Sequence, residues 1–293
     1  MAIYRACHTH QPSARVLFCH GNGLSAACNA HFLDELARFA DVYAYDARGH
    51  GASAPFASPD QVNGWRPFVD DILFLARSKA LASFNPSLPL HFVGHSLSAN
   101  SALASLSRSP NTFDGVHLVE PVLLPAGLTL SYHLSRLMGL GLYTHPLAHA
   151  TLKRRTSWPR RQAAFDYLFG RKALATWPAE AVSNYVFSAL RPETDGQGSE
   201  QVTLCCPPAI ESRIFVDIPS TYITAKLHQH APVHVIRGTG KGSTVDARRL
   251  QALDSRLSDL HVSAVSNVGH FAMIEKPDEC AALIRAKIGA NGS

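Results

Sequence analysis

The chain has 293 residues, of which 46% are apolar and 17% are charged, the composition of an ordinary folded protein rather than a disordered one. Its length suits one large α/β domain, or one such domain that carries an insertion. The formal net charge is +5, but no dense run of lysines accompanies it, so we expect no nucleic-acid partner.

The sequence also favours a cytoplasmic protein without stable membrane insertion. Residues 1–8 contain no apolar core of signal-peptide length. The most apolar long stretch, 121–150, is interrupted by polar residues such as Ser131, His133 and Arg136. The six cysteines are scattered without a CxxC pair, which favours reduced thiols. The oligomeric state stays open.

Apolar runs bounded by turn residues alternate with longer segments of helical period. This alternation is typical of the α/β class, with a mostly parallel, doubly wound sheet flanked by helices. In chain order we expect strands at 16–19, 42–45, 90–93 and 116–120, and helices at 26–39, 68–81 and 97–106.

The alternation breaks at Pro121. From there to about residue 218 no parallel-strand unit is clear, which indicates a helical insertion. The sequence therefore predicts a core domain of residues 1–120 and 219–293 and a helical cap, or lid, of residues 121–218. Within and after the cap we expect helices at 161–169 and 179–190, a polar loop at 192–199, strands at 233–237 and 260–265, and helices at 245–257 and 278–288.

A serine stands between the third strand and the helix after it, in the turn Gly94-His95-Ser96-Leu97-Ser98. A Gly-x-Ser-x-Gly turn at such a junction holds its serine in a strained conformation, with the hydroxyl exposed above the sheet. Ser98 replaces the last glycine and is small enough to keep helix and strand close. The turn predicts that Ser96 is a nucleophile, provided that a base, an acid and an oxyanion hole accompany it.

His270 is the best-placed base among the 16 histidines. Histidine suits proton transfer near neutral pH, and Gly269-His270-Phe271 follows the last predicted strand. Loops at the carboxyl ends of parallel strands converge on one rim of the sheet. His270 can therefore reach Ser96 despite their separation in the sequence.

The oxyanion of an acyl-transfer intermediate needs two fixed donors. One is the backbone N–H of Leu97, at the start of the helix after the serine. The second comes from the glycine-rich loop His20-Gly21-Asn22-Gly23, after the first parallel strand, as the N–H of Asn22 or Gly23.

Together these motifs resemble the α/β-hydrolase-fold serine hydrolases of the esterase and lipase type. The likeness rests on His20-Gly21-Asn22-Gly23, Asp46-Ala47-Arg48-Gly49-His50-Gly51, Gly94-His95-Ser96-Leu97-Ser98 and Gly269-His270-Phe271, in that order. It covers roughly residues 1–120 and 230–293. The resemblance implies a mostly parallel sheet, a helical cap after the sixth strand, serine hydrolysis and no cofactor.

The acid of the expected triad is missing from its usual place. This fold usually carries it in a Gly-x-x-Asp turn after the strand at 233–237, where this chain has Gly238-Thr239-Gly240-Lys241. A lysine would repel an imidazolium rather than orient it. We therefore expect Glu120 to be the acid, since some members of the fold place a glutamate at the end of the neighbouring strand. Asp246 is the second choice.

The cap carries the features that we expect to select a substrate. A basic cluster, Lys153-Arg154-Arg155 with Arg160 and Arg161, suits either a substrate anion or a solvated helix face. His145 and His149 have helical i, i+4 spacing but no third ligand, so we expect no metal. Seven leucines suit either an apolar acyl pocket or the cap's own core: Leu123, Leu124, Leu128, Leu130, Leu134, Leu137 and Leu140.

We therefore expect a serine hydrolase that cleaves an ester of a small, largely apolar acyl substrate through an acyl-enzyme. Ser96 attacks, His270 takes its proton, and Glu120 orients the imidazole. A lactonase, a thioesterase and a carbon–carbon bond hydrolase of the same fold are alternatives. A ligand receptor without activity on the same scaffold is a further one.

Overall fold

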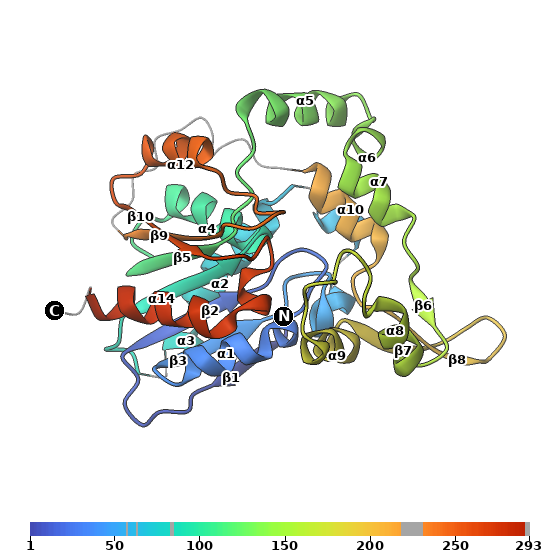
Figure 1. The fold of residues 1–293 in the computed structure, drawn as a ribbon, viewed down its shortest axis with the longest axis horizontal. Coiled ribbons are helices and arrows are strands. Elements are labelled where there is room, and N and C mark those ends of the chain that lie inside the picture. Colours follow the sequence, from blue (N-terminus) through green and yellow to red (C-terminus); the bar gives the residue numbers. More distant parts are fainter. Residues whose placement is uncertain (57, 63, 83–84, 218–230, 291–293) are drawn as a thin grey trace.

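Seven strands form the main sheet in the part of the chain that the structure, a computed structural model, describes: residues 1–56, 58–62, 64–82, 85–217 and 231–290. Their order is β1-β3-β2-β4-β5-β9-β10, and every neighbouring pair is parallel except β1 with β3 (Figure 1). The strands are β1 Ile3–Ala6, β2 Ala14–Cys19, β3 Ala40–Tyr45, β4 Leu90–His95, β5 Gly115–Val119, β9 Val233–Gly238 and β10 Leu260–Val265. The predicted mostly parallel sheet is confirmed.

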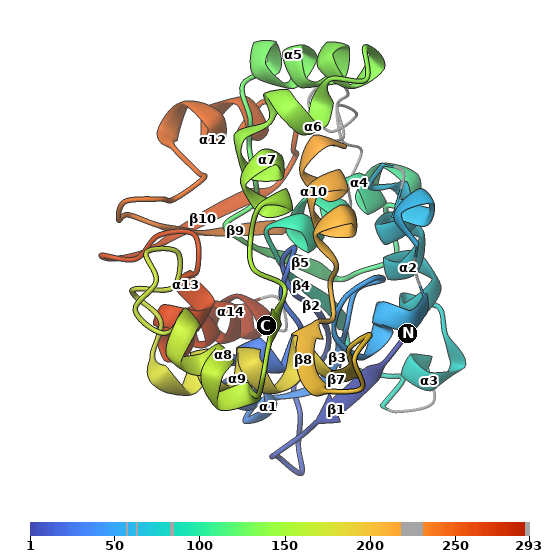
Figure 2. The same ribbon diagram turned by 90° about the vertical axis from the view of Figure 1, so that its right-hand side faces the viewer.

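Helices cover both faces of this sheet (Figures 1 and 2). They are α1 Ala30–Ala37, α2 Arg66–Ala76, α3 Lys79–Ala82, α4 Leu97–Arg108, α12 Ala247–Asp254, α13 Ala272–Glu275 and α14 Pro277–Ala290, with 3₁₀ turns η1 Ala26–Asn29, η2 Gly51–Phe56 and η3 Pro59–Val62. Successive side chains of β2 pack into hydrophobic clusters on opposite faces of the sheet, because side chains alternate along a strand. Val16 packs in one cluster with Phe32 of α1 and Ile284 of α14, whereas Leu17 packs in another with Leu103 of α4. Both faces are covered, as the doubly wound prediction requires.

The predicted helix at 68–81 is two helices, α2 and α3. The break lies at Ser78, whose N–H donates to Leu75 O and whose hydroxyl accepts from Leu81 N at 3.4 Å. A serine that accepts from the third residue after it is a typical helix start. The predicted helix at 26–39 likewise begins as the 3₁₀ turn η1 before α1.

The segment between β5 and β9 is not purely helical, which corrects the prediction for the cap. Its helices are α5 Ala126–Leu137, α6 Gly141–Thr144, α7 Pro146–Leu152, α8 Arg161–Leu168, α9 Ala179–Ser188 and α10 Pro208–Val216. It also holds an antiparallel sheet in the order β6-β8-β7, made of Ser157–Trp158, Glu200–Leu204 and Leu190–Thr194 respectively. The predicted boundary at 218/219 falls on residues 218–230, outside the described part of the chain.

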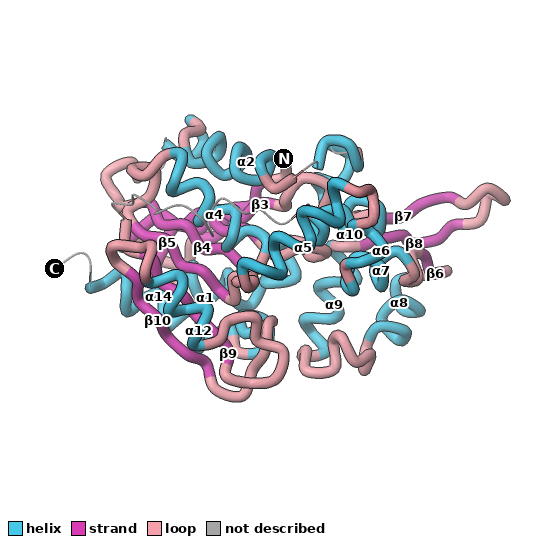
Figure 3. The backbone as a smooth tube through the Cα atoms, turned by 90° about the horizontal axis from the view of Figure 1, so that it is seen from above, coloured by secondary structure: helices cyan, strands magenta, loops and turns pink. Residues whose placement is uncertain are grey.

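The hairpin of β7 and β8 takes up part of the predicted polar loop at 192–199 and projects away from the main sheet (Figure 3). Its turn is closed by Asp195, whose carboxylate accepts from the N–H groups of Gln197 and Ser199 at 2.9 and 2.8 Å. The residues of β7 after Leu190 are exposed, so the strand lacks the apolar alternation by which strands are predicted. Among the described residues, no helix has both the length and the apolar character needed to cross a bilayer.

Three buried histidines form a row across neighbouring strands of the main sheet. His91 Nδ1 lies 3.2 Å from His117 Nε2, and His117 Nδ1 lies 3.2 Å from His234 Nδ1. The row ends where His234 Nε2 meets Ser263 Oγ at 2.8 Å. Burial lowers the pKa of His91 and of His234 to about 4 and that of His117 well below its ordinary value. The row is therefore neutral at pH 7.

We expect the free energy of unfolding to fall as the pH drops from 6.5 towards 4. An unfolded histidine gains its proton near pH 6.5, whereas the buried row resists protonation until about pH 4. Over that window the unfolded state binds more protons, so each histidine costs about 1.4 kcal/mol per pH unit. Above pH 6.5 the row contributes no pH dependence. Urea denaturation at several pH values measures the slope.

The exposed His8 supplies a control for this measurement, because it pairs only with the exposed Asp34. A His8→Asn variant should show the same slope as the unchanged protein. Equal free energies of unfolding at pH 7 and pH 5 would contradict the neutral row.

Candidate active site

Ser96 lies in the turn between β4 and α4 with φ 52° and ψ −108°. Such a backbone conformation is costly for any residue with a side chain, and it marks functional sites more often than ordinary turns. The helix also approaches the strand closely here, since a Cβ on Gly94 would lie 2.8 Å from Ala99 N. The local geometry is thus that of the strained serine turn that the motif predicts.

Ser98, which stands where the motif has its last glycine, makes two hydrogen bonds that stabilise the turn. Its hydroxyl accepts from His95 N at 2.8 Å and donates to Cys19 O at 2.5 Å. The second bond links the serine turn to the end of β2. The departure from glycine therefore adds a bond between neighbouring strands without opening the turn.

His270 follows β10 and reaches Ser96, with 3.0 Å between His270 Nε2 and Ser96 Oγ. Its backbone carbonyl accepts a hydrogen bond from His95 Nε2 at 2.8 Å. Burial and the neighbouring His270 lower the pKa of His95 to about 3, so His95 stays neutral and can donate from only one nitrogen. Sequence reasoning missed this positioning contact of His95.

Glu120 lies directly behind His270, with 3.5 Å between Glu120 Oε2 and His270 Nδ1. The carboxylate is fully buried and accepts from Gly238 N at 2.6 Å, Thr244 N at 2.7 Å and Ser243 Oγ at 2.7 Å. Burial alone would raise the pKa of Glu120, but the contacts with His270 and with these donors outweigh it and hold the pKa below its usual value. Glu120 is therefore ionised at neutral pH.

Thr244 bridges the acid and the base. Its hydroxyl lies 3.0 Å from Glu120 Oε2 and 3.3 Å from His270 Nδ1, so it can accept from the imidazole while it donates to the carboxylate. The hydroxyl is closer to the imidazole than the carboxylate oxygen is. The sequence contains no motif that could have revealed Thr244, because only the fold brings residues 120, 244 and 270 together.

The second-choice acid, Asp246, does not lie at His270 in the structure. It is exposed and caps α12, where its carboxylate accepts from Arg249 N at 2.8 Å and pairs with the Arg249 guanidinium. Lys241 is also exposed, and its carbonyl abuts the loop of His270, because a Cβ on Gly269 would lie 2.5 Å from Lys241 O. Glu120 is the carboxylate that the fold brings to His270.

The loop of Gly21, Asn22 and Gly23 packs against the serine turn. A Cβ on Gly21 would lie 2.7 Å from His95 Nδ1 and 3.2 Å from Ser96 Cβ, so only glycine fits there. Gly23 N donates to His50 Nε2 at 2.9 Å, which commits that N–H group. Across the described residues, the N–H groups of Asn22 and Leu97 donate no hydrogen bond within the protein. These two groups are therefore available to an oxyanion.

His50, which holds Gly23, belongs to the second loop at this end of the sheet. Burial and His20 lower its pKa to about 3, and its Nδ1–H donates to Arg48 O at 2.9 Å, so Nε2 is left as an acceptor. Asp46 stabilises the same loop by accepting from Ala26 N and Ala52 N at 2.8 and 2.9 Å. These contacts give Asp46 a structural role in the loop.

Arg154 of the basic cluster turns inward and contacts Glu211 of α10, with 3.0 Å between Arg154 Nη1 and Glu211 Oε1. Burial raises the pKa of Glu211 even against the attraction of Arg154. Glu211 O also accepts from Asn22 Nδ2 at 3.0 Å. The carbonyl of Glu211 thus joins the cap to the loop beside Ser96, and the ion pair lies within the cap, while Lys153 and Arg155 are exposed.

The leucine-rich part of the cap does not form an enclosed acyl pocket. Leu123 is buried and Leu124 half-buried. The other leucines are exposed by 38 to 81%: Leu128, Leu130, Leu134, Leu137 and Leu140. The sequence cannot distinguish these outcomes, because a leucine stripe at helical spacing does not say which face of its helix is covered.

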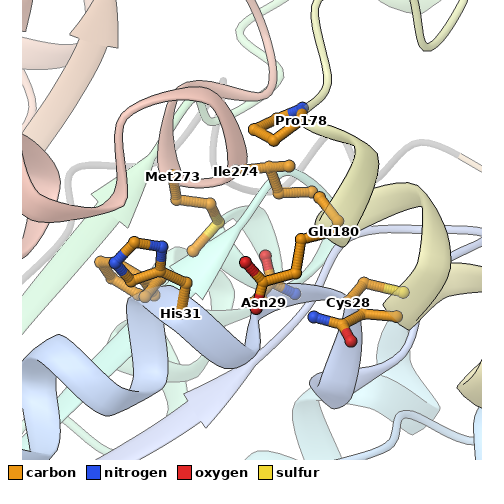
Figure 4. A pocket seen from close by; sticks show the side chains of 10 residues that line it. Cys28, Asn29, His31, Pro178, Glu180, Met273 and Ile274 are labelled. Carbon is orange, nitrogen blue, oxygen red and sulfur yellow. The ribbon is translucent and has the colours of Figure 1, made fainter.

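One candidate metal-binding group and one pocket among the described residues do not include Ser96. His145 is buried and caps α7 by accepting from Ala148 N at 3.4 Å, so part of the His145/His149 pair is used within the helix. Among the described residues, one group has three potential ligand atoms within 4.8 Å of one another: His31, Glu35 and Asp278. Figure 4 shows the neighbouring pocket, which is lined by Cys28, Asn29, His31, Phe32, Pro178, Glu180, Ala181, Asn184, Met273 and Ile274.

Three solved structures illustrate how widely this fold is shared. E-2-(acetamidomethylene)succinate hydrolase is 20% identical, with 98% of this chain and 94% of that chain covered at a TM-score of 0.71. The thioesterase domain from the curacin biosynthetic pathway is 21% identical, with 97% and 94% covered at a TM-score of 0.69. The esterase Rv0045c from Mycobacterium tuberculosis is 22% identical, with 94% and 84% covered at a TM-score of 0.67.

The family assignment comes from the match of the sequence to a family model. No curated protein matches the chain, but the family model described as serine aminopeptidase, S33, matches residues 10–182, which is more than half of the chain. The protein is therefore a hydrolase of the α/β-hydrolase fold and belongs to the serine aminopeptidase S33 family.

Proposed function

We propose that this protein cleaves a carboxylic ester, or a related acyl bond, of a small and largely apolar substrate by nucleophilic attack of Ser96. The observation that carries the proposal is the contact of 3.0 Å between Ser96 Oγ and His270 Nε2 in a strained turn. The ionised Glu120 behind His270 supports it, because a carboxylate at that place stabilises an imidazolium.

The reaction would proceed in two steps. Ser96 attacks the carbonyl carbon while His270 takes the hydroxyl proton, and the N–H groups of Asn22 and Leu97 hold the oxyanion. His270 then returns the proton to the leaving group, which leaves an acyl-enzyme. Water attacks the acyl-enzyme with His270 again as base, and Ser96 is released.

The cap of residues 121–218 would choose the substrate, since Glu211 of the cap accepts a hydrogen bond from Asn22 of the oxyanion loop. Among the solved structures of similar fold are an esterase, a thioesterase domain and a hydrolase named for a substituted succinate. Ester, thioester and carbon–carbon substrates are therefore all of interest. We favour an ester over a carbon–carbon substrate, because an ester carries a leaving group that needs no further activation by the protein, and the substrate panel below separates ester from thioester.

Turnover of a substrate panel tests the proposal. The panel holds p-nitrophenyl esters of increasing acyl length, with lactones and acyl thioesters alongside. We expect the highest kcat/KM on an ester, and the preferred acyl length measures the space under the cap. A larger kcat/KM on a thioester or a lactone would reassign the substrate class while leaving Ser96 as nucleophile. No turnover of any member would favour a ligand receptor.

We expect Thr244→Val to lower kcat by about tenfold or more, with little change in KM. The hydroxyl bridges His270 and Glu120, and a hydrogen bond to a charged group is worth about 1.5–3 kcal/mol, which corresponds to a factor of about 10–100 in rate.

Thr244→Ser is the matched control for this prediction, since it keeps the hydroxyl and removes only the methyl group. It should restore most of the rate. Equal rates for Thr244→Val and the unchanged enzyme would show that His270 is held by Glu120 alone.

A further inference from the structure

On helix α5 of the cap, the exposed face is apolar and the buried face is polar. Its outward face carries Leu130, Leu134 and Leu137, which are 60, 51 and 81% exposed. Thr129 and Ser135, by contrast, are buried at 2 and 7%. The three leucines are spaced by four and three residues and therefore share one face of the helix. A helix that packs on a core normally has the reverse arrangement.

Polar contacts on the inner face of α5 hold this orientation. The Ser135 hydroxyl contacts the Thr144 hydroxyl of α6, and Arg136 forms an ion pair with the buried Asp217. Rotating α5 to bury its leucines would break these contacts and leave Asp217 without its ion pair, which is costly. The exposed leucines are therefore a stable feature of the cap.

The apolar surface continues beyond α5. Met138, Tyr143 and Leu147 are 66, 73 and 56% exposed, and they lie after the end of α5, on α6 and on α7 respectively. These three helices follow one another down one side of the cap, with α5 as the outermost element (Figures 1 and 2). We call Leu130, Leu134, Leu137, Met138, Tyr143 and Leu147 the cap face. Apolar surface gathered in this way marks an interaction site rather than ordinary scatter.

The exposed charges of residues 121–165 are positive. This stretch contains no aspartate or glutamate but six basic residues, of which Arg136 and Arg154 are paired with Asp217 and Glu211. The other four are Lys153, Arg155, Arg160 and Arg161. Lys153 and Arg155, just after α7, are exposed. Two copies meeting through this face would bring like charges together, which argues against a homodimer. An apolar helical ridge flanked by cations, without acids, suits the surface of an anionic lipid layer.

We propose that the cap face docks on an anionic lipid surface, with the leucines of α5 entering the headgroup region and Lys153 and Arg155 close to the lipid phosphates. The protein would then lie on the membrane surface without spanning it. Docking through the cap would also bring the part of the chain that we expect to select the substrate close to a source of apolar substrates.

Vesicle co-sedimentation tests the proposal on the full-length protein. Vesicles of phosphatidylcholine with 30% phosphatidylglycerol are compared with vesicles of pure phosphatidylcholine. We expect binding to the mixed vesicles that weakens as salt is raised, because surface charges are screened. The double variant Leu134→Ser with Leu137→Ser should lower the partition coefficient by about tenfold or more. Lys153→Glu should lower it by about fivefold or more, since a single basic residue near the surface contributes about that factor.

Matched controls come from the rest of the chain. Phe74 of α2 is 68% exposed and lies on the core domain, away from the cap face, so Phe74→Ser should bind vesicles like the unchanged protein. Lys172→Glu is the control for charge, because Lys172 is exposed but lies between α8 and α9. Thermal unfolding checks that each variant is folded.

Three results would overturn the proposal. The first is no binding of the unchanged protein to the mixed vesicles. The second is an equal loss of binding in the cap-face variants and their controls. The third is a dimer in sedimentation analysis that the Leu134→Ser, Leu137→Ser variant dissociates, since the cap face would then bind a second copy.

Discussion

Replacing Ser96 by alanine is expected to lower kcat on any accepted ester by roughly 10⁵-fold or more, the effect of removing the nucleophile from an enzyme of this type. The alanine cannot form the acyl-enzyme, so only the oxyanion donors and substrate binding would contribute to the remaining rate. KM should change little. The Ser96 hydroxyl contacts His270, so we do not expect its loss to weaken substrate binding. Steady-state kinetics on the best ester of the panel measures both constants.

Ser101→Ala is the matched control for this experiment. Ser101 lies on the same helix and is buried, and its hydroxyl donates only to Leu97 O at 2.8 Å. The control should keep most of the activity. If Ser96→Ala retained more than a few per cent of the rate, Ser96 would not be the nucleophile.

Replacing Glu120 by glutamine is expected to lower kcat by up to about 10⁴-fold. The substitution removes the negative charge that stabilises the imidazolium of His270. In either orientation the new amide places its NH2 group where the carboxylate accepts hydrogen bonds, either from Gly238 N and Ser243 Oγ or from Thr244 N and the Thr244 hydroxyl. The loss should appear mainly in kcat, because His270 carries its charge in the transition state, and steady-state kinetics measures it.

Asp246→Asn is the comparison that assigns the acid. Asp246 is exposed and caps α12 through Arg249 N, so its replacement should cost some stability and almost no activity. An inactive Asp246→Asn together with a nearly unchanged Glu120→Gln would show that Asp246, and not Glu120, is the acid that acts on His270. Circular dichroism of both variants confirms that the helices are intact.

The sequence was sufficient for the core domain because its signals are local. Each strand of the parallel sheet is a short apolar run, and each flanking helix shows a one-sided apolar stripe. The serine turn is also local, since Gly94, Ser96 and Ser98 lie within five residues of one another. The choice of Glu120 over Asp246 followed from the lysine at position 241, and the structure places Glu120, not Asp246, at His270.

The residues that sequence reasoning missed act across long separations. Thr244 acts between residues 120 and 270, and His50 holds the loop of Gly23. Neither belongs to a spacing pattern, because the sheet alone brings them to the site. His95 lies beside the serine, yet its bond to the His270 carbonyl appears only when the last loop is placed.

The structure of the cap was the part of the fold that the sequence pattern predicted least well. Its strand β7 is made mostly of exposed polar residues, which are typical of a loop when the pairing is unknown. The leucines of α5 were expected either in a pocket or in a core, but the polar contacts of Ser135 and Arg136 turn them outward. Contacts between residues far apart in the cap sequence decide both the hairpin and the orientation of α5. Hydrophobic periodicity carries no information about such contacts.

Covalent labelling of the protein by a fluorophosphonate, followed by mass spectrometry of its peptides, tests the nucleophile most directly. A serine activated by a neighbouring histidine reacts with such a probe, whereas an ordinary serine hydroxyl does not. We expect one added phosphonyl group on Ser96, with no labelling of Ser96→Ala and slower labelling of Glu120→Gln. An unlabelled protein, under conditions that fully label a known serine hydrolase, or a label on another residue, would contradict it.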